Sequence, residues 1–159
     1  MAPRLLTFAA TALLTLASCS ARPDAQPNIA VTDAWARATV TGQSGSAAYM
    51  TIGNTGDGSD RLLSAGSPGA AASLHSSSSE GGVMRMRALP DGLEIPAGAK
   101  VNLQPGGAHI MLTGLSAPLA TGSQFPLTLK FERSGQRKIS VRVVDPSAAG
   151  MAMNGMEGM

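Results

Sequence analysis

His109 and Met111 stand two residues apart in the stretch GGAHIMLTG, whose apolar residues predict a buried β-strand. The chain contains only two histidines, so the placement of one of them beside a methionine is informative. Side chains two residues apart on a strand point to the same side of the sheet. We therefore expect an imidazole nitrogen and a thioether sulfur to be presented together, with Ile110 and Leu112 turned to the opposite face.

A second segment carries the same residue types. His75 precedes the stretch GGVMRMR, in which Met84 and Met86 share one face of a predicted strand. If the fold brings this segment beside the first one, two neutral nitrogens and two neutral sulfurs converge: His75, Met86, His109 and Met111. Thioether is a soft ligand that favours Cu(I). Zn(II) instead prefers thiolate, imidazole and carboxylate, and Ca(II) and Mg(II) take oxygen ligands.

From the residues alone, a metal-free alternative stays open. Methionine on a strand often fills a core, and a lone histidine is often a surface or hydrogen-bonded residue. The rival interpretation is therefore a structural or adhesive β-sandwich lipoprotein. Exposure separates the two, because ligands for a transferable metal should be accessible at one end of the sandwich, whereas packing residues should be covered.

The N-terminal segment has the pattern of a secretory signal. Arg4 precedes an apolar stretch from Leu5 to Ala17 that is too short to predict a membrane-spanning helix. The stretch ends in LASC, which resembles the bacterial lipobox, and the only cysteine, Cys19, occupies the lipidated position. We expect a lipoprotein signal peptide over residues 1–18 and a periplasmic protein anchored through Cys19 to the inner or outer membrane.

The remaining chain divides by composition. Residues 19–28 are polar, contain two prolines and predict a flexible tether. Residues 29–145 consist of short apolar runs between turns such as NTGDGSD, LPDG and QPGG, which indicates one antiparallel β-sandwich or barrel. Residues 146–159 predict a disordered Met-rich tail. The predicted strands are 29–35, 47–54, 61–66, 72–76, 83–87, 92–95, 100–104, 109–114, 126–132 and 138–144.

Several functional classes are disfavoured. Charged residues make up 14% of the chain and the net charge is +2, with no basic cluster for nucleic acid. The stretch GQSGS breaks the G-x-S-x-G pattern of serine hydrolases, and no acids stand out as a catalytic pair, so we do not expect an enzyme. A blue-copper electron carrier needs a cysteine ligand, which a lipidated Cys19 cannot supply.

The spacing of the candidate ligands resembles that of the periplasmic copper chaperones of the PCuA(C) type. Those proteins carry a His, ten residues, a Met, about twenty-one more residues and then His-x-Met. Here ten residues separate His75 from Met86, and twenty-two separate Met86 from His109. The resemblance extends over residues 29–144 and includes DAWARAT, SAAYMTIGN, GVMRMR, GLEIPAG, LQPGGAHIMLTGL and FPLTLKFE.

This resemblance implies a cupredoxin-like Greek-key antiparallel β-sandwich with an exposed Cu(I) site. The implied ligands are His75, Met86, His109 and Met111. The implied role is an extracytoplasmic metallochaperone that carries copper towards the CuA centre in subunit II of cytochrome c oxidase, often beside a Sco-type copper protein.

Two departures from the family pattern affect the accessory ligands. Many relatives have another Met close after the first His, whereas this chain has HSSSSE. The tail contains no His, so its methionines predict a Cu(I) collector and no Cu(II) site. The candidate accessory ligands are Met84, Met151, Met153, Met156 and Met159.

Overall fold

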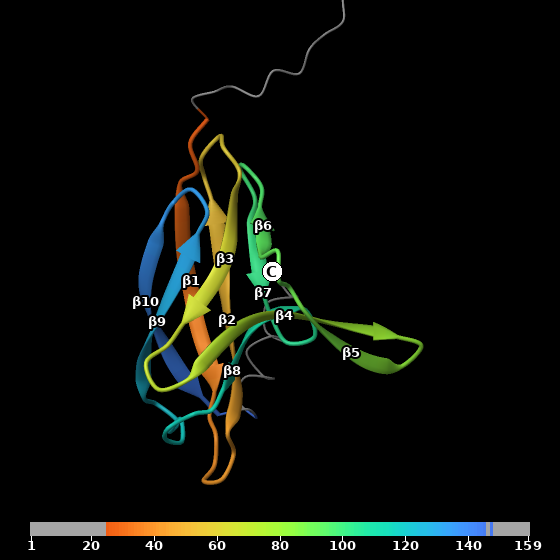
Figure 1. Ribbon diagram of the computed structural model, residues 1–159, viewed down its shortest axis with the longest axis vertical. Coiled ribbons are helices and arrows are strands. Elements are labelled where there is room, and N and C mark those ends of the chain that lie inside the picture. The colour runs from red at the N-terminus through yellow and green to blue at the C-terminus, as the bar shows by residue number, and fades with distance from the viewer. Residues whose placement is uncertain (1–24, 146, 148–159) are drawn as a thin grey trace, which may run out of the picture.

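Alternating apolar residues form ten strands in the computed structural model, which describes residues 25–145 and 147 (Figure 1). Each segment predicted from the sequence overlaps one of these strands, and the all-β fold class is confirmed. Within the described residues, no helix is long and apolar enough to cross a membrane. The strands are β1 Ile29–Arg37, β2 Gly45–Asn54, β3 Asp60–Gly66, β4 Ala71–Glu80, β5 Val83–Ala88, β6 Leu93–Ile95, β7 Lys100–Leu103, β8 Ala108–Thr113, β9 Gln124–Phe131 and β10 Gln136–Val144.

The strands follow a Greek-key order. Hydrogen bonding connects them as β5-β4-β8-β2-β1-β10-β9-β3-β6, and β7 pairs with β2. β8 thus lies between β4 and β2, although both precede it in the sequence. β1 pairs with β10 in parallel, with Trp35 opposite Arg142, while the other ladders between these strands are antiparallel. The expected antiparallel sandwich therefore contains one parallel pair, which joins its first and last strands.

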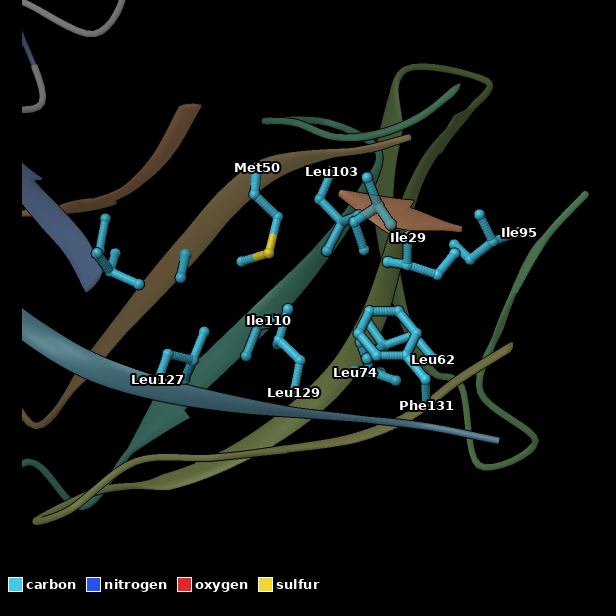
Figure 2. Close-up of a cluster of buried hydrophobic side chains, with 14 of the residues drawn as sticks. Ile29, Met50, Leu62, Leu74, Ile95, Leu103, Ile110, Leu127, Leu129 and Phe131 are labelled. Carbon is cyan, nitrogen blue, oxygen red and sulfur yellow. The ribbon is translucent and has the colours of Figure 1, made fainter. Parts of the chain in front are cut away.

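The core lies between the two layers of this curled sheet (Figure 2). Figure 2 shows Leu127 and Leu129 of β9 facing Met50 of β2 and Ile110 of β8. These side chains are buried, and each large one contributes about 1.5–3 kcal/mol when it leaves water. Because every second residue of β2 and β8 enters this core, the intervening residues must lie on the outer face.

β4 is longer than the sequence predicts. The serine run after Ser76 has no apolar period, yet the strand continues to Glu80 because it pairs with β5. All residues of β5 are exposed, and the β4–β5 hairpin projects from the body of the sandwich (Figure 1). Glu80 forms exposed ion pairs with Arg85 at 3.5 Å and with Arg87 at 3.9 Å. Such pairs add little stability, so the backbone ladder is the main support of the hairpin.

The last residues of the predicted tether contact the sandwich. The end of the predicted tether, residues 25–28, is hydrogen-bonded to the last residue of β2 and to the loop that follows: the N–H of Asn28 donates to Asn54 at 3.0 Å, and that of Gln26 donates to Asp57 at 2.9 Å. A Cβ on Gly56 would lie only 2.1 Å from the Gln26 carbonyl oxygen, so the close approach requires glycine. The folded region therefore begins before Ile29, because these polar residues bind the loop.

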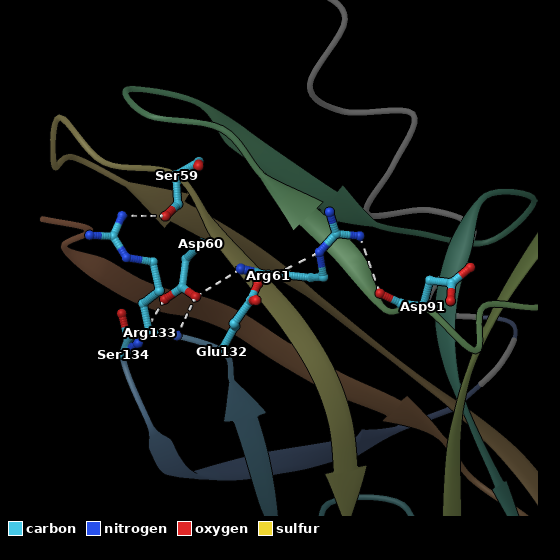
Figure 3. A network of polar contacts seen from close by, with 7 residues as sticks. All are labelled: Ser59, Asp60, Arg61, Asp91, Glu132, Arg133 and Ser134. Carbon is cyan, nitrogen blue, oxygen red and sulfur yellow. Dashed lines mark hydrogen bonds and ion pairs between the residues drawn. The ribbon is translucent and has the colours of Figure 1, made fainter. Parts of the chain in front are cut away.

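A buried carboxylate, Asp60, organises the same end of the sandwich (Figure 3). Its Oδ1 accepts hydrogen bonds from the N–H groups of Arg61 at 2.8 Å and Arg133 at 2.9 Å, and its Oδ2 accepts one from Ser134 at 2.9 Å. Burial raises the pKa of Asp60, but the hydrogen bonds of Ser134, Arg133 and Arg61 outweigh it, so the pKa lies below its ordinary value. The ionised carboxylate therefore links the start of β3 to the turn after β9.

Replacing this carboxylate by an amide, Asp60→Asn, should lower the free energy of unfolding by about 1–3 kcal/mol near pH 7, because a charged acceptor of backbone N–H groups is lost. Since the folded pKa is depressed, the wild-type contribution is present above the unfolded pKa of about 4 and is lost as the pH falls below it. Urea unfolding near pH 7 and near pH 3 measures both effects.

The matched control is Asp91→Asn. The side chain of Asp91 is exposed, and the contact of this residue with Arg61 is made through the backbone carbonyl. An equal loss of stability in the two variants would contradict the role assigned to Asp60.

Candidate metal centre

The two histidines are neighbours on the outer face of the sheet. β8 turns Ile110 and Leu112 fully into the core, so His109 and Met111 alternate onto the opposite face. β4 pairs with β8 in a register that places His75 directly opposite His109. Residues opposite one another in an antiparallel ladder share a face. The structure therefore brings together two histidines that are far apart in the sequence.

The two methionines lie diagonally on either side of this pair. Met111 is opposite Ser73 on β4, two residues from His75. Met86 of β5 is opposite Ser77, two residues from His75 in the other direction. Diagonal neighbours on one face are about 7–8 Å apart, which long side chains can bridge. All four predicted ligands thus occupy one face of three adjacent strands.

The separation of the two imidazoles suits one shared ion. Their ring centres are 6.1 Å apart, with 28° between the ring planes. A metal–imidazole bond is about 2 Å long, so two imidazoles on one ion have ring centres about 5–6 Å apart. His75 and His109 are therefore close to the spacing that a bridging metal requires.

The hydrogen bond of His109 fixes its tautomer. The ring is buried, with 4% of the residue exposed, and its Nδ1 lies 3.0 Å from the carbonyl oxygen of Gly107. Because a carbonyl can only accept, the neutral imidazole must carry its proton on Nδ1. Nε2 then keeps a free lone pair, and a backbone carbonyl bound to the second nitrogen is typical of metal-ligating histidines.

His75 has an unpartnered nitrogen. Its Nε2 lies 3.0 Å from the hydroxyl oxygen of Ser73, while its Nδ1 is buried and has no hydrogen-bond partner among residues 25–145 and 147. A buried polar atom without a partner costs about 1–3 kcal/mol. If Nε2–H donates to Ser73, the lone pair of Nδ1 becomes available to an ion that removes this cost. The orphaned nitrogen therefore fits a metal ligand better than a packing residue.

Three of the predicted ligands, Met86, His109 and Met111, line an open pocket of about 620 Å³. His75 contacts His109 but is not part of the pocket wall. The sequence predicts donors at one end of the sandwich, whereas the candidate residues lie on the outer face of its strands. The reason is that the donors occupy positions within strands, where the pleat decides their direction.

An aromatic wall beside the donors was missed by sequence reasoning. Tyr49 is 5% exposed, and its ring centre lies 6.3 Å from that of His109 and 4.5 Å from that of Trp35. The guanidinium carbon of Arg37 lies 5.8 Å from the Tyr49 ring centre. Burial raises the pKa of Tyr49, and the positive charge of Arg37 opposes this only in part, so the neutral phenol offers no anionic donor. In the sequence, these side chains alternate with alanines that are buried in the structure. This period-two pattern could have indicated which face of the sheet they occupy.

The accessory candidates are less closely placed. Met84 shares a face with Met86 but lies opposite Ser79, further out on the hairpin, and does not line the pocket. Cys19 and the tail methionines lie outside the described residues. In the part of the chain that is described, no group of three or more His, Cys, Asp or Glu could hold a metal ion.

Comparisons with known proteins agree with this architecture. The family described as "Putative lipoprotein LpqE-like" matches residues 29–143. "Putative lipoprotein Lxx21020" of Leifsonia xyli subsp. xyli (strain CTCB07) is 35% identical over 152 residues, covering 90% of each chain. "Uncharacterized protein RP573" of Rickettsia prowazekii (strain Madrid E) is 30% identical over 115 residues, covering 70% of this chain and 64% of its own.

Solved structures of copper-binding domains share the fold. The "Copper-bound PCuAC domain from PmoF2" is 27% identical with a TM-score of 0.62, covering 74% of this chain and 93% of its own. The "Solution structure of CuI-DR1885 from Deinococcus Radiodurans" is 30% identical with a TM-score of 0.58, covering 82% of this chain and 84% of its own. The resemblance to PCuAC domains and the cupredoxin-like fold that it implies are thus confirmed.

Methyl NMR of the methionines tests the donor set directly. One equivalent of Cu(I) should shift the ε-methyl signals of Met86 and Met111, because their sulfurs would bind the ion. Met50 is 2% exposed on the core side of β2, so its methyl should stay in place and serves as the internal control. A shift of Met50 as large as that of Met111, or an unmoved Met86, would contradict the assignment.

Proposed function

This chain belongs to the LpqE-like lipoprotein family, and from that membership and its outer-face donor set we propose that it is an extracytoplasmic Cu(I)-binding metallochaperone. The observation that carries the proposal is the pairing of His75 with His109 on a face that also bears Met86 and Met111. Copper in the names of the PmoF2 and DR1885 structures supports the same metal.

The donor chemistry favours the reduced ion. Two imidazoles and two thioethers are neutral and soft, and Cu(I) accepts such ligands without a carboxylate. No acid lines the pocket within the described part of the chain. Thioethers also persist in an oxidising compartment, where thiolates are lost to disulfides. We therefore take Cu(I) as the cargo and ligand exchange as the chemistry, with no bond made or broken in a substrate.

Exposure of the sulfurs supports a carrier over a metal-free structural domain. Met84 is 62% exposed and Met86 is 52% exposed, although a packing methionine would be covered. Met86 also sits on the projecting β4–β5 hairpin, where a partner can reach it (Figure 1). Because His109 is buried and Met86 is open, a recipient would displace Met86 first and the histidines last.

The anchor and the recipient complete the proposal. A relative named as a lipoprotein supports lipidation at Cys19 and attachment to the inner or outer membrane of the periplasm. β1 runs from Ile29, which follows the tether, to Arg37, which lines the pocket. The donors would thus be accessible to a protein beyond the anchor. We propose the CuA centre in subunit II of cytochrome c oxidase as recipient, beside a Sco-type copper protein.

Competition for Cu(I) against a chelator tests the core site. His109→Ala and Met111→Ala should each weaken binding at least about tenfold, which corresponds to about 1.4 kcal/mol. Met50→Leu is the matched control, because Met50 points into the core, and it should bind as the wild type does. Unchanged affinity in both site variants would remove the basis for the proposal.

The tail is tested separately by replacing its methionines with leucine. The variant carries Met151→Leu, Met153→Leu, Met156→Leu and Met159→Leu. It should still bind one equivalent of Cu(I) tightly at the site that contains the histidines, and should lose only weaker binding of additional Cu(I). Loss of the tight equivalent would move the main site from the sandwich to the tail.

Transfer experiments test the recipient. Cu(I)-loaded protein should pass its copper to an apo CuA domain, and His109→Ala should transfer less because it is incompletely loaded. Metal appearing on a Sco-type protein but not on the CuA domain would assign the delivery step to that partner instead.

A further inference from the structure

Arg37 is an exposed cation in the wall of the donor pocket. It lines the same pocket as Met86, His109 and Met111. Among residues 25–145 and 147, the ion pairs join other residues, and Arg37 takes part in none of them. Its guanidinium instead lies against the ring of Tyr49. Arg37 is exposed, so its charge is open to a ligand that enters the pocket.

The backbone holds Arg37 in this position. The hydroxyl of Ser46 donates to the Arg37 carbonyl oxygen at 2.7 Å, and the N–H of Ala38 donates to the Val144 carbonyl oxygen at 2.8 Å. The end of β1 is therefore fixed between β2 and β10. Contact with the aromatic face adds a second constraint on the guanidinium. The cation is thus presented by rigid strands and not by a loop.

The charges in the loaded pocket would all be positive. The four donors are neutral, the cargo ion is positive, and Arg37 adds a further positive charge. Glu80, on the neighbouring hairpin, is engaged by Arg85 and Arg87 and does not line the pocket. Within the described part of the chain, a loaded pocket therefore has two positive charges and no acidic residue in its wall, which favours binding of an anion.

We propose that Arg37 is the anion subsite of this pocket and binds a carboxylate on the ligand that exchanges copper with the protein. The inference rests on the proposed copper function. Arginine suits this task because its planar guanidinium binds a carboxylate through two parallel hydrogen bonds. A copper ligand that bears both a soft donor and a carboxylate would contact the ion and Arg37 together.

The dimensions of the pocket fit such a ligand. The ring centre of His109 lies 6.3 Å from that of Tyr49, and the guanidinium carbon of Arg37 lies 5.8 Å from the same Tyr49 centre, so the His109 ring and the cation are at most about 12 Å apart. The volume of about 620 Å³ lies within the range of small-molecule sites. A molecule or side chain with its donor and its carboxylate a few bonds apart therefore has room to reach both groups.

A matched pair of probes tests the subsite. Acetylmethionine and acetylmethioninamide present the same thioether, and only the first has a carboxylate. Each is titrated into the apo protein and into the Cu(I)-loaded protein while the amide NMR signals of residues 42–47 and 106–111 are followed. The loaded wild type should bind acetylmethionine at least about tenfold more tightly, a preference of about 1.4 kcal/mol. Equal affinity for these two probes, together with equal affinity for the two peptides described below, would overturn the proposal.

Variants assign the preference to one residue. Arg37→Gln should abolish it, and Arg37→Lys should retain part of it, because lysine keeps the charge but loses the bidentate geometry. The matched control is Arg142→Gln, which removes an exposed arginine opposite Trp35 that does not line the pocket. A preference that survives in Arg37→Gln, or that disappears in Arg142→Gln, would contradict the assignment.

Peptide probes distinguish the source of the carboxylate. Acetyl-Met-Asp-Gly-amide and acetyl-Met-Asn-Gly-amide differ only in a side-chain carboxylate of the kind that a partner protein would present. An Arg37-dependent preference for the aspartate peptide assigns the carboxylate to a protein side chain, and one limited to acetylmethionine assigns it to a small molecule. If neither pair of probes shows a preference for the carboxylate, the subsite proposal is overturned.

Copper uptake is measured on the same samples, so failure of the metallochaperone proposal can be distinguished from failure of the subsite proposal. If the wild type takes up no Cu(I), the metallochaperone function fails, while an Arg37-dependent carboxylate preference in the apo protein would still support the subsite. If Cu(I) is bound tightly but both probe pairs bind without preference, the subsite alone is rejected.

Discussion

The pairing of His75 with His109 across β4 and β8 is the contact on which the proposed chemistry depends. The core fixes it, because Leu74 of β4 and Ile110 of β8 are opposite one another and both point inward. A slip of one residue in this ladder would turn His109 into the core and Ile110 into solvent. The apolar residues thus set the register, and the register sets the positions of the donors.

The outer face combines a rigid part with an accessible part. His109 is buried among Tyr49, the backbone of Gly107 and the other histidine. Met86 is open on an edge strand with exposed neighbours. A carrier needs both properties, because the ion must be held during transport and yet be reachable by the next ligand. The sandwich meets this need by placing the donors on strands of different exposure.

The sequence predicts the strands and the common face of His109 and Met111, because period-two alternation is a local signal. It does not predict from local pattern that His75 faces His109, since that depends on which distant strands pair. The spacing shared with a known family supplies that expectation. The extension of β4 through its serines was missed because only pairing with β5 makes those residues a strand. The position of Arg37 in the pocket wall was not predicted, because it depends on the order of the strands in the sheet, which is not a local signal in the sequence.

X-ray absorption at the copper edge distinguishes nitrogen from sulfur ligands, so it tests whether both histidines and both methionines bind one ion. With one equivalent of Cu(I) on the protein, the copper should have a mixed shell of two nitrogens at about 2.0 Å and two sulfurs at about 2.3 Å. The nitrogen signal should carry the outer-shell scattering of imidazole. A shell of sulfur alone would place the ion on methionines away from the histidines. A shell without sulfur would show that Met86 and Met111 are not ligands, and either result would contradict the site described here.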